Sequence, residues 1–161
     1  HFDNSIINRL ESIGVKLSYV TLHVGGGTFL PIKTDNISDH KMHSEYGVVS
    51  PEVAEEINQT KKIGGRLIAV GTTSARLLET ASNDNLCSSF EGNTDIFIKP
   101  GYDFNLIDGL ITNFHLPKST LIMLVASLIG LKECKDLYSY AIEKKYRFFS
   151  YGDASLLIPK R

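Results

Sequence analysis

The sequence is poor in several residue types, and each shortage excludes a class of protein. Only two cysteines, Cys87 and Cys134, occur in 161 residues, which predicts reduced thiols rather than a disulfide framework. The formal net charge of −1 gives no overall basic field, so a nucleic-acid partner would have to be held by a local patch. No apolar run approaches the roughly 18 residues of a membrane span, and no signal peptide is visible. We therefore expect a cytoplasmic protein that does not contact a membrane.

An initiator methionine is also missing, since the chain opens on His1-Phe2 directly ahead of a helix signal. This opening predicts a piece of a longer protein. The 42% hydrophobic content excludes a disordered tail, and the length fits one ordinary domain spanning residues 1–161. No repeat or low-complexity segment divides that domain.

Helical and strand patterns alternate along most of the chain. Capping residues ahead of apolar residues at helical spacing predict helices that begin at Asp3, Ser50 and Ser119 or Thr120, with others after Gly71 and around residues 137–144. Apolar runs predict strands, and the strand ranges are residues 15–24, 67–70, 94–98, 106–111 and 156–158, with a polar loop at 83–92. This order favours an α/β fold with a three-layer arrangement and a mixed sheet.

The segment 108–120 sets polar residues between a predicted core strand and a predicted helix. Asn113 and His115 form the tip, and Pro117 ends the strand. Open α/β sheets often bind ligands at such a position. We predict that Asn113 binds substrate and that His115 is a candidate catalytic residue. The structural alternative for His115 is a hydrogen bond within the turn that Pro117 forces.

A second candidate follows the predicted strand that ends near His23. The three consecutive glycines Gly25, Gly26 and Gly27, followed by Thr28, would let a ligand lie against backbone N–H groups. The segment matches neither the nucleotide P-loop nor the dinucleotide fingerprint. A bulge or tight turn explains it equally well.

The segment 39–46 crowds together His40, His43 and Glu45. Two histidines at i, i+3 could share one helical face, with Glu45 completing a metal set. The zinc-protease pattern needs histidines at i, i+4, and no cysteine lies nearby. A polar segment that faces substrate or solvent is therefore the better interpretation.

Hydroxyl residues crowd the start of the predicted helix after residue 70. Gly71, Thr72, Thr73 and Ser74 are followed by Arg76. A helix N-terminus with backbone N–H groups suits a carboxylate or phosphate, and an arginine one turn in strengthens that interpretation. Simple capping is the alternative, but it needs only one hydroxyl.

The C-terminal segment 146–153 carries Arg147, Tyr151 and Asp153, which we predict to bind substrate. Together with Phe148 and Phe149, Arg147 could stack on a base or ring. In the structural alternative, which we favour for the phenylalanines, they are core residues and Arg147 pairs with a carboxylate.

Several long motifs occur in one order that resembles the S-adenosylmethionine:tRNA ribosyltransferase-isomerase family of queuosine biosynthesis. They are His1-Phe2, Leu22-His-Val-Gly-Gly-Gly-Thr-Phe29, His40-Lys-Met-His-Ser-Glu45, Ala69-Val-Gly-Thr-Thr-Ser74, Thr94-Asp-Ile-Phe-Ile98, Ile111-Thr-Asn-Phe-His-Leu-Pro117 and Tyr146-Arg-Phe-Phe-Ser-Tyr-Gly-Asp153. One mild departure is Gly26, where the family usually has a different small residue.

The resemblance implies transfer of the ribosyl part of S-adenosylmethionine onto 7-aminomethyl-7-deazaguanine in a tRNA anticodon loop. The products would be epoxyqueuosine in tRNA, adenine and methionine. S-adenosylmethionine would be a co-substrate, with no permanently bound cofactor and no metal needed. Family members are roughly twice as long. The chain would therefore be the C-terminal portion of the catalytic domain of a two-domain enzyme, without its N-terminal half and inserted β-barrel.

This chemistry requires a base for a C5′ proton, an acid for departing adenine and an anchor for the methionine carboxylate. We expect His43 or His115 to be the base, with Glu45 and His23 as further candidates. The segment 71–74 would anchor the carboxylate, and the glycine loop would pass against the adenosyl group. Two alternatives stay open, a non-catalytic half that binds tRNA or ligand and a metal-dependent hydrolase built on His40, His43 and Glu45. We expect a monomer.

Overall fold

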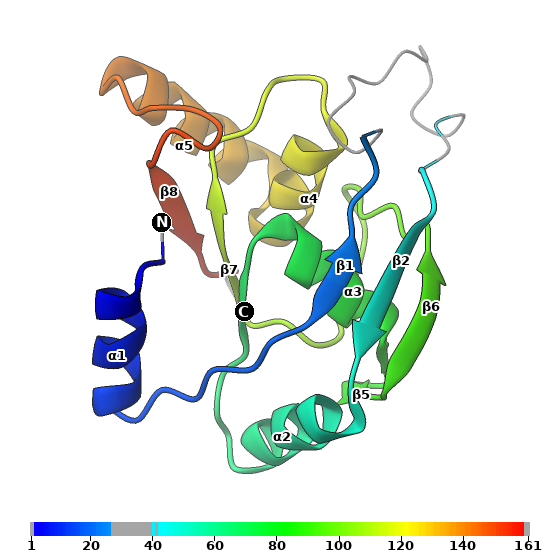
Figure 1. The fold of residues 1–161 in the computed structure, drawn as a ribbon. Helices are drawn as coiled ribbons and strands as arrows, with labels where there is room; N and C mark the ends of the chain where they lie inside the picture. The colour runs from blue at the N-terminus through cyan, green and yellow to red at the C-terminus, as the bar shows by residue number, and fades with distance from the viewer. Residues whose placement is uncertain (1, 27–39, 41, 160–161) are drawn as a thin grey trace.

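The computed structural model describes residues 2–26, 40 and 42–159 (Figure 1). The elements in chain order are α1 (Asn4–Ser12), β1 (Thr21–His23), β2 (Glu45–Val49), α2 (Pro51–Lys62), β3 (Ile68–Val70), α3 (Thr72–Thr80), β4 (Ser82–Asn83), β5 (Leu86–Cys87), β6 (Phe90–Thr94), β7 (Gly109–Asn113), α4 (Thr120–Ile129), α5 (Leu131–Glu143) and β8 (Ala154–Leu157).

The strands form two three-stranded sheets and one short hairpin. One sheet has the order β3-β7-β8, with β3 parallel and β8 antiparallel to β7, so it is mixed. The other sheet, β1-β2-β6, is antiparallel. Helix α3 contacts β1 and β2 of one sheet and β3 and β7 of the other, and it forms the layer between them. The predicted α/β fold with a mixed sheet is confirmed.

The predicted helix starts are confirmed by their capping bonds. Asp3 accepts a hydrogen bond from the Ile6 N–H at 2.9 Å, Ser50 accepts one from Val53 at 3.3 Å, and Ser119 accepts one from Ile122 at 3.2 Å. Each bond satisfies a first-turn N–H that has no partner within its helix, so short local signals were sufficient to place these ends.

Two strand predictions were wrong in position. The predicted strand 15–24 contains only β1, and the predicted strand 94–98 lies one segment too late, because the paired residues are those of β6. Thr94 pairs with Glu45, the first residue of β2, so the chain after Thr94 has passed the end of its neighbouring strand. The segment predicted as a polar loop, residues 83–92, instead contains most of the β4-β5 hairpin and the start of β6.

The core lies between the helices and the two sheets. Its most buried large side chains come from α3, α4, β2, β7 and the segment before β7, and they include Leu77, Leu106, Leu110 and Leu124. Fully burying a leucine contributes about 1.5–3 kcal/mol, so these positions fix how β7 and α3 meet.

A buried carboxylate that the sequence analysis missed organises the approach to β7. Glu79 of α3 is 3% exposed and accepts hydrogen bonds from the backbone N–H groups of Asn105, Leu106 and Ile107 at 2.8, 3.0 and 3.1 Å. The hydroxyl of Tyr102 donates a fourth at 3.1 Å. Burial raises the pKa of Tyr102 to about 12, and the neighbouring Glu79 adds to that shift. Glu79 thus holds the turn from which β7 begins.

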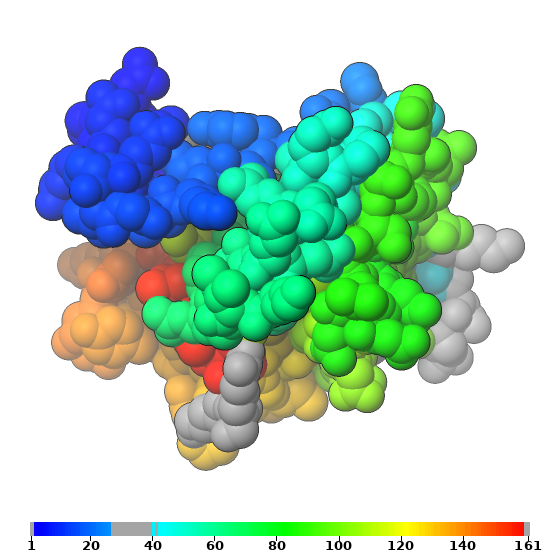
Figure 2. All heavy atoms as spheres, turned by 90° about the horizontal axis from the view of Figure 1, so that it is seen from below, coloured from blue at the N-terminus to red at the C-terminus, as the bar shows by residue number. Residues whose placement is uncertain are grey.

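Helix α1 is the least buried element. None of its residues is buried, and in Figure 2 it occupies one corner of the face seen from below, beside α2. A hollow of about 220 Å³ runs along it, lined by Ile6, Leu10 and Ile13 among others, and none of the predicted site residues lines it. Among the described residues, no helix combines the length and apolar character needed to cross a bilayer.

Candidate functional site

The parallel pairing of β3 with β7 brings two predicted segments to one end of the mixed sheet. Val70 pairs with Ile111, and the Gly71 N–H donates to the Ile111 carbonyl at 2.8 Å. The segment 71–74 therefore follows β3 at the same end of the sheet where β7 ends in Asn113 and is followed by His115. Carboxyl ends of neighbouring parallel strands are a common ligand position in α/β sheets.

A buried network joins three motifs that are far apart in the sequence. Glu45 accepts a hydrogen bond from Arg76 Nη1 at 2.6 Å through one carboxylate oxygen and from the Gly25 N–H at 3.1 Å through the other. Glu45 is 2% and Arg76 3% exposed. The desolvation of two charges is unfavourable, so a buried pair of this kind requires good geometry and further hydrogen bonds. The structure thus places the glycine segment, the 39–46 segment and the start of α3 at one site.

The start of α3 is not capped by a side chain. Gly71 is the N-cap residue, with φ at 89°, and no side chain in the described part of the chain caps the helix with a hydrogen bond. Simple capping, the structural alternative for the hydroxyls, is therefore not observed. Thr72 is buried and lies on the same helical face as Arg76, four residues later. Substrate binding by Thr72, Thr73 and Ser74 stays a prediction.

Gly25 and Gly26 lie in open surroundings. A Cβ atom added to either glycine would meet no atom within 4 Å. Crowding by the described chain is therefore not the reason for glycine at these positions. The other two predicted residues of this loop, Gly27 and Thr28, lie outside the described residues.

His115 is buried against two hydroxyl groups. Its Nε2 lies 2.9 Å from Thr112 Oγ1, and its backbone N–H donates to Tyr138 Oη at 3.0 Å. Burial lowers the pKa of His115 to about 4 and raises that of Tyr138 to about 12. A general base works best with a pKa near the operating pH, so this arrangement favours the structural alternative for His115. Neither hydroxyl partner was recognised from sequence, although Thr112 and His115 have the i, i+3 spacing of a turn.

We expect the burial of His115 to make the protein sensitive to acid. Its pKa of about 4 in the folded protein lies below the usual 6.5, so as pH falls the unfolded chain takes up this proton first. The free energy of unfolding should therefore fall by about 2–3 kcal/mol as pH drops from about 6.5 to about 4. Urea unfolding at several pH values measures this loss. His115→Gln should lose less stability over the same interval, and an equal loss in both proteins would assign the titration to other groups.

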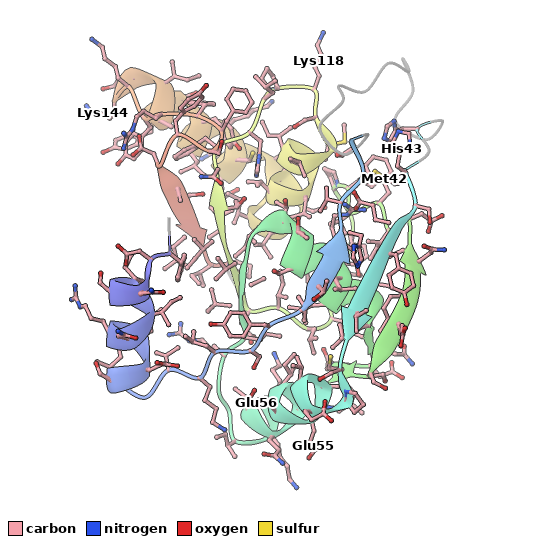
Figure 3. The ribbon with its side chains drawn as sticks, viewed as in Figure 1. Met42, His43, Glu55, Glu56, Lys118 and Lys144 are labelled. Carbon is pink, nitrogen blue, oxygen red and sulfur yellow. The ribbon has the colours of Figure 1, made fainter. Side chains whose placement is uncertain are left out.

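The other three described histidines, His23, His40 and His43, have different neighbours. The ring of His23 is 5.9 Å from that of Tyr46, and the ring of His40 meets Phe97 edge-on at 5.3 Å. His43 is exposed and lies beside Met42 at the end of the molecule where Lys118 is also found, opposite Glu55 and Glu56 (Figure 3).

The three-residue metal set is not assembled. No group of three histidine, cysteine, aspartate or glutamate side chains within residues 2–26, 40 and 42–159 could hold a metal ion. The carboxylate of Glu45 bonds Arg76 and Gly25 instead. The described residues therefore give no support to the hydrolase alternative built on His40, His43 and Glu45.

The C-terminal candidates form their own cluster. Asp153 accepts hydrogen bonds from the backbone N–H of Arg147 at 2.5 Å and from its guanidinium at 3.0 and 3.2 Å. These contacts lower the pKa of Asp153 and raise that of Arg147. Asn113 donates to the Asp153 carbonyl at 3.1 Å, which joins the cluster to the end of β7. Tyr151 is 71% exposed.

The two phenylalanines of this segment differ. The ring of Phe148 is half-buried and packs on Phe114 and Tyr138, at 5.5 and 6.0 Å, so it belongs to an aromatic cluster beside the core and the core interpretation holds only in part. Phe149 is 43% exposed, and the core interpretation is wrong for it. Arg147 pairs with the carboxylate of Asp153, as the structural alternative predicted.

The fold and the site together define an α/β protein with its polar groups gathered where its two parallel strands end. Comparison with known proteins identifies the family within this class. The chain belongs to the queuosine biosynthesis protein family, whose model matches residues 1–157. The resemblance seen in the sequence motifs is confirmed.

Several relatives carry the name S-adenosylmethionine:tRNA ribosyltransferase-isomerase. The chain is 58% identical over 161 residues to the one from Roseobacter denitrificans, covering all of this chain and 46% of that protein. It is 56% identical to the one from Ruegeria pomeroyi, covering 99% of this chain and 46% of that protein. The crystal structure of an S-adenosylmethionine tRNA ribosyltransferase from Thermotoga maritima matches with a TM-score of 0.80 and 39% identity, over 98% of this chain and 50% of that one. The chain therefore spans about half the length of these relatives.

Proposed function

We propose that this chain is part of an enzyme that transfers and isomerises the ribosyl group of S-adenosylmethionine onto 7-aminomethyl-7-deazaguanine in tRNA. The products are epoxyqueuosine in tRNA, adenine and methionine. The observation that carries this proposal is the network of Gly25, Glu45 and Arg76, because it joins two of the family's motifs, in one buried site, to the helix α3 that begins within a third. The names of the relatives support the same reaction.

The residues take the following roles in this proposal. His43 removes the C5′ proton that the sulfonium has made acidic, since it is exposed and lies two residues before Glu45 of the buried network. The buried ion pair of Glu45 and Arg76 holds the site together. His23 lies on β1, the strand that pairs with β2. The segment 71–74 anchors the methionine carboxylate. The glycine loop lies against the adenosyl group.

The tRNA contacts are proposed for the exposed C-terminal cluster. Tyr151 offers an exposed ring for stacking on a base, while Arg147 and Asp153 fix the turn that presents it. Asn113 ties that turn to the end of β7. A cytoplasmic location and a monomeric state stay predictions.

A release assay tests the proposed reaction. The chain and its longest natural form are incubated with substrate tRNA and labelled S-adenosylmethionine, and free adenine is measured. Adenine release that depends on the tRNA is the expected result for the longest form. A non-catalytic half that binds tRNA or ligand is the second candidate, favoured by the span of about half the relatives' length. Release by the longest form alone would assign this chain to that second candidate.

We expect the hydroxyls at the start of α3 to contribute to the binding of the co-substrate S-adenosylmethionine. Replacing Thr72 and Thr73 together by Val keeps the side-chain shape but removes two donors. Binding of S-adenosylmethionine, measured by calorimetry on the longest natural form, should weaken by about 1–3 kcal/mol. Thr21→Val, at an exposed position of β1, serves as the control and should bind normally. Unchanged binding in the double variant would remove these hydroxyls from the site.

A further inference from the structure

Arg76 has two buried donors without a partner. Its side chain is 4% exposed, and its Nη1 is taken by Glu45 at 2.6 Å. Neither Nε nor Nη2 has a hydrogen-bond partner in the described part of the structure, although both atoms are buried. A buried donor left unsatisfied costs about 1–3 kcal/mol, more when it is charged. Two such donors on one guanidinium therefore indicate a missing acceptor.

Arg76 also lines a small cavity. The cavity has a volume of about 10 Å³, room for the centre of one water-sized group. Its walls come from the chain before β2, the segment after β6 and the start of α4, and the lining residues are Met42, Arg76, Ile96, Phe97, Ile98, Thr120, Leu121 and Leu124. The polar side chains among them are those of Arg76 and Thr120. The free donors thus belong to a site with mostly apolar walls.

The start of α4 adds positive potential to this cavity. Thr120 is the first residue of this ten-residue helix. The N-cap residue Ser119 accepts one hydrogen bond from the Ile122 N–H through its hydroxyl and one from the Met123 N–H through its carbonyl. The first-turn N–H groups of a helix and its dipole both favour a negative group. This matters because Glu45 already neutralises the charge of Arg76, so the helix supplies the excess positive potential that a further anion needs.

The shape of the free donors selects the ligand. Nε and Nη2 form one edge of the planar guanidinium fork, which matches two oxygens of a planar acceptor. The cavity admits one water-sized atom, which a carboxylate oxygen matches and a purine ring does not, and its mostly apolar walls offer too few donors for a phosphate. We propose that Arg76 and the first turn of α4 form a binding site for a carboxylate group on an aliphatic chain. If the ligand is the methionyl carboxylate of S-adenosylmethionine, this carboxylate site rests on the proposed function and adds detail to it. If the ligand is another small carboxylate, the site does not depend on the proposed function.

The first experiment tests the site without S-adenosylmethionine. Sodium acetate is titrated into the longest natural form of the chain, labelled with ¹⁵N, and the Nε–H signal of Arg76 is followed by NMR, with sodium chloride as the control. A saturable shift with acetate alone is expected. If neither acetate nor S-adenosylmethionine moves this signal, the carboxylate site is wrong. If acetate moves it and S-adenosylmethionine does not, the site stands and the methionyl source is overturned.

The second experiment tests the source. Arg76→Lys keeps a cation opposite Glu45 but loses the two-pronged edge. Its affinity for S-adenosylmethionine should fall about 10- to 100-fold, whereas its affinity for decarboxylated S-adenosylmethionine should change less than about twofold. Arg66→Lys, at an exposed position, is the matched control. Equal losses for both ligands would mean that Arg76 acts only through the fold and would overturn the proposed contact. If Arg76→Lys does not fold, the two ligands are compared on the unmodified protein by the Arg76 Nε–H signal, which only the carboxylate-bearing ligand should move.

Discussion

Replacing His43 by Gln should lower turnover roughly 10²–10⁴-fold, the usual contribution of a general base, with little loss of stability. Stability should survive because His43 is exposed, and glutamine keeps a polar side chain of similar length. Turnover is measured as adenine release in the longest natural form of the chain. The free energy of unfolding is measured in the same samples.

His115 supplies the contrasting variant. Its imidazole is buried, its pKa is lowered to about 4, and Nε2 is already engaged with Thr112. His115→Gln should therefore leave turnover nearly intact while changing stability, because the amide can still make one hydrogen bond in the turn. A fall in turnover for His115→Gln with normal turnover for His43→Gln would reverse the assignment. Normal turnover in both variants would contradict a histidine base and make Glu45 the next candidate for the base.

Replacing Glu79 by Gln should destabilise the fold by about 3–5 kcal/mol, a large part of the stability of a domain this size. Each carboxylate oxygen of Glu79 now accepts two hydrogen bonds. A glutamine amide group offers one accepting oxygen, and its NH₂ group would face donors rather than acceptors. At least one backbone N–H in the turn before β7 would lose its partner in the core. Denaturant unfolding measures the change.

Tyr102→Phe is the matched control for Glu79. It removes one donor to the same carboxylate and leaves the backbone bonds in place, so the loss should be only about 1–2 kcal/mol. An equally small loss for Glu79→Gln would show that the turn holds β7 without this carboxylate. The prediction would then be wrong.

Local signals in the sequence determined the helix ends and the fold class. Asp3, Ser50 and Ser119 cap their helices as predicted, because a cap needs only a side-chain oxygen and an N–H group within three residues. The alternation of elements predicted the α/β fold with a mixed sheet, since buried strands and amphipathic helices have different apolar spacing. The residues of the motifs and their order together predicted the family.

Strand position was decided by the tertiary structure. Residues 94–98 have the better strand pattern, yet β6 is Phe90–Thr94, because a strand extends only as far as its neighbour β2 offers hydrogen bonds. Ile98 is instead 2% exposed and packs in the core beyond the strand. A pattern records which side chains are apolar, but it cannot record where the partner strand ends.

The chemistry of the site was also decided by the tertiary structure. The sequence offered His43 and His115 as the base, with Glu45 and His23 as further candidates, and it could not choose between the two histidines. Burial changes the pKa of His115, Arg76 takes the carboxylate of Glu45, and His43 alone of the three stays exposed. Proton affinity and ion pairing depend on desolvation and on neighbours distant in sequence, here Arg76 31 residues beyond Glu45, and such distances are set only when the chain folds.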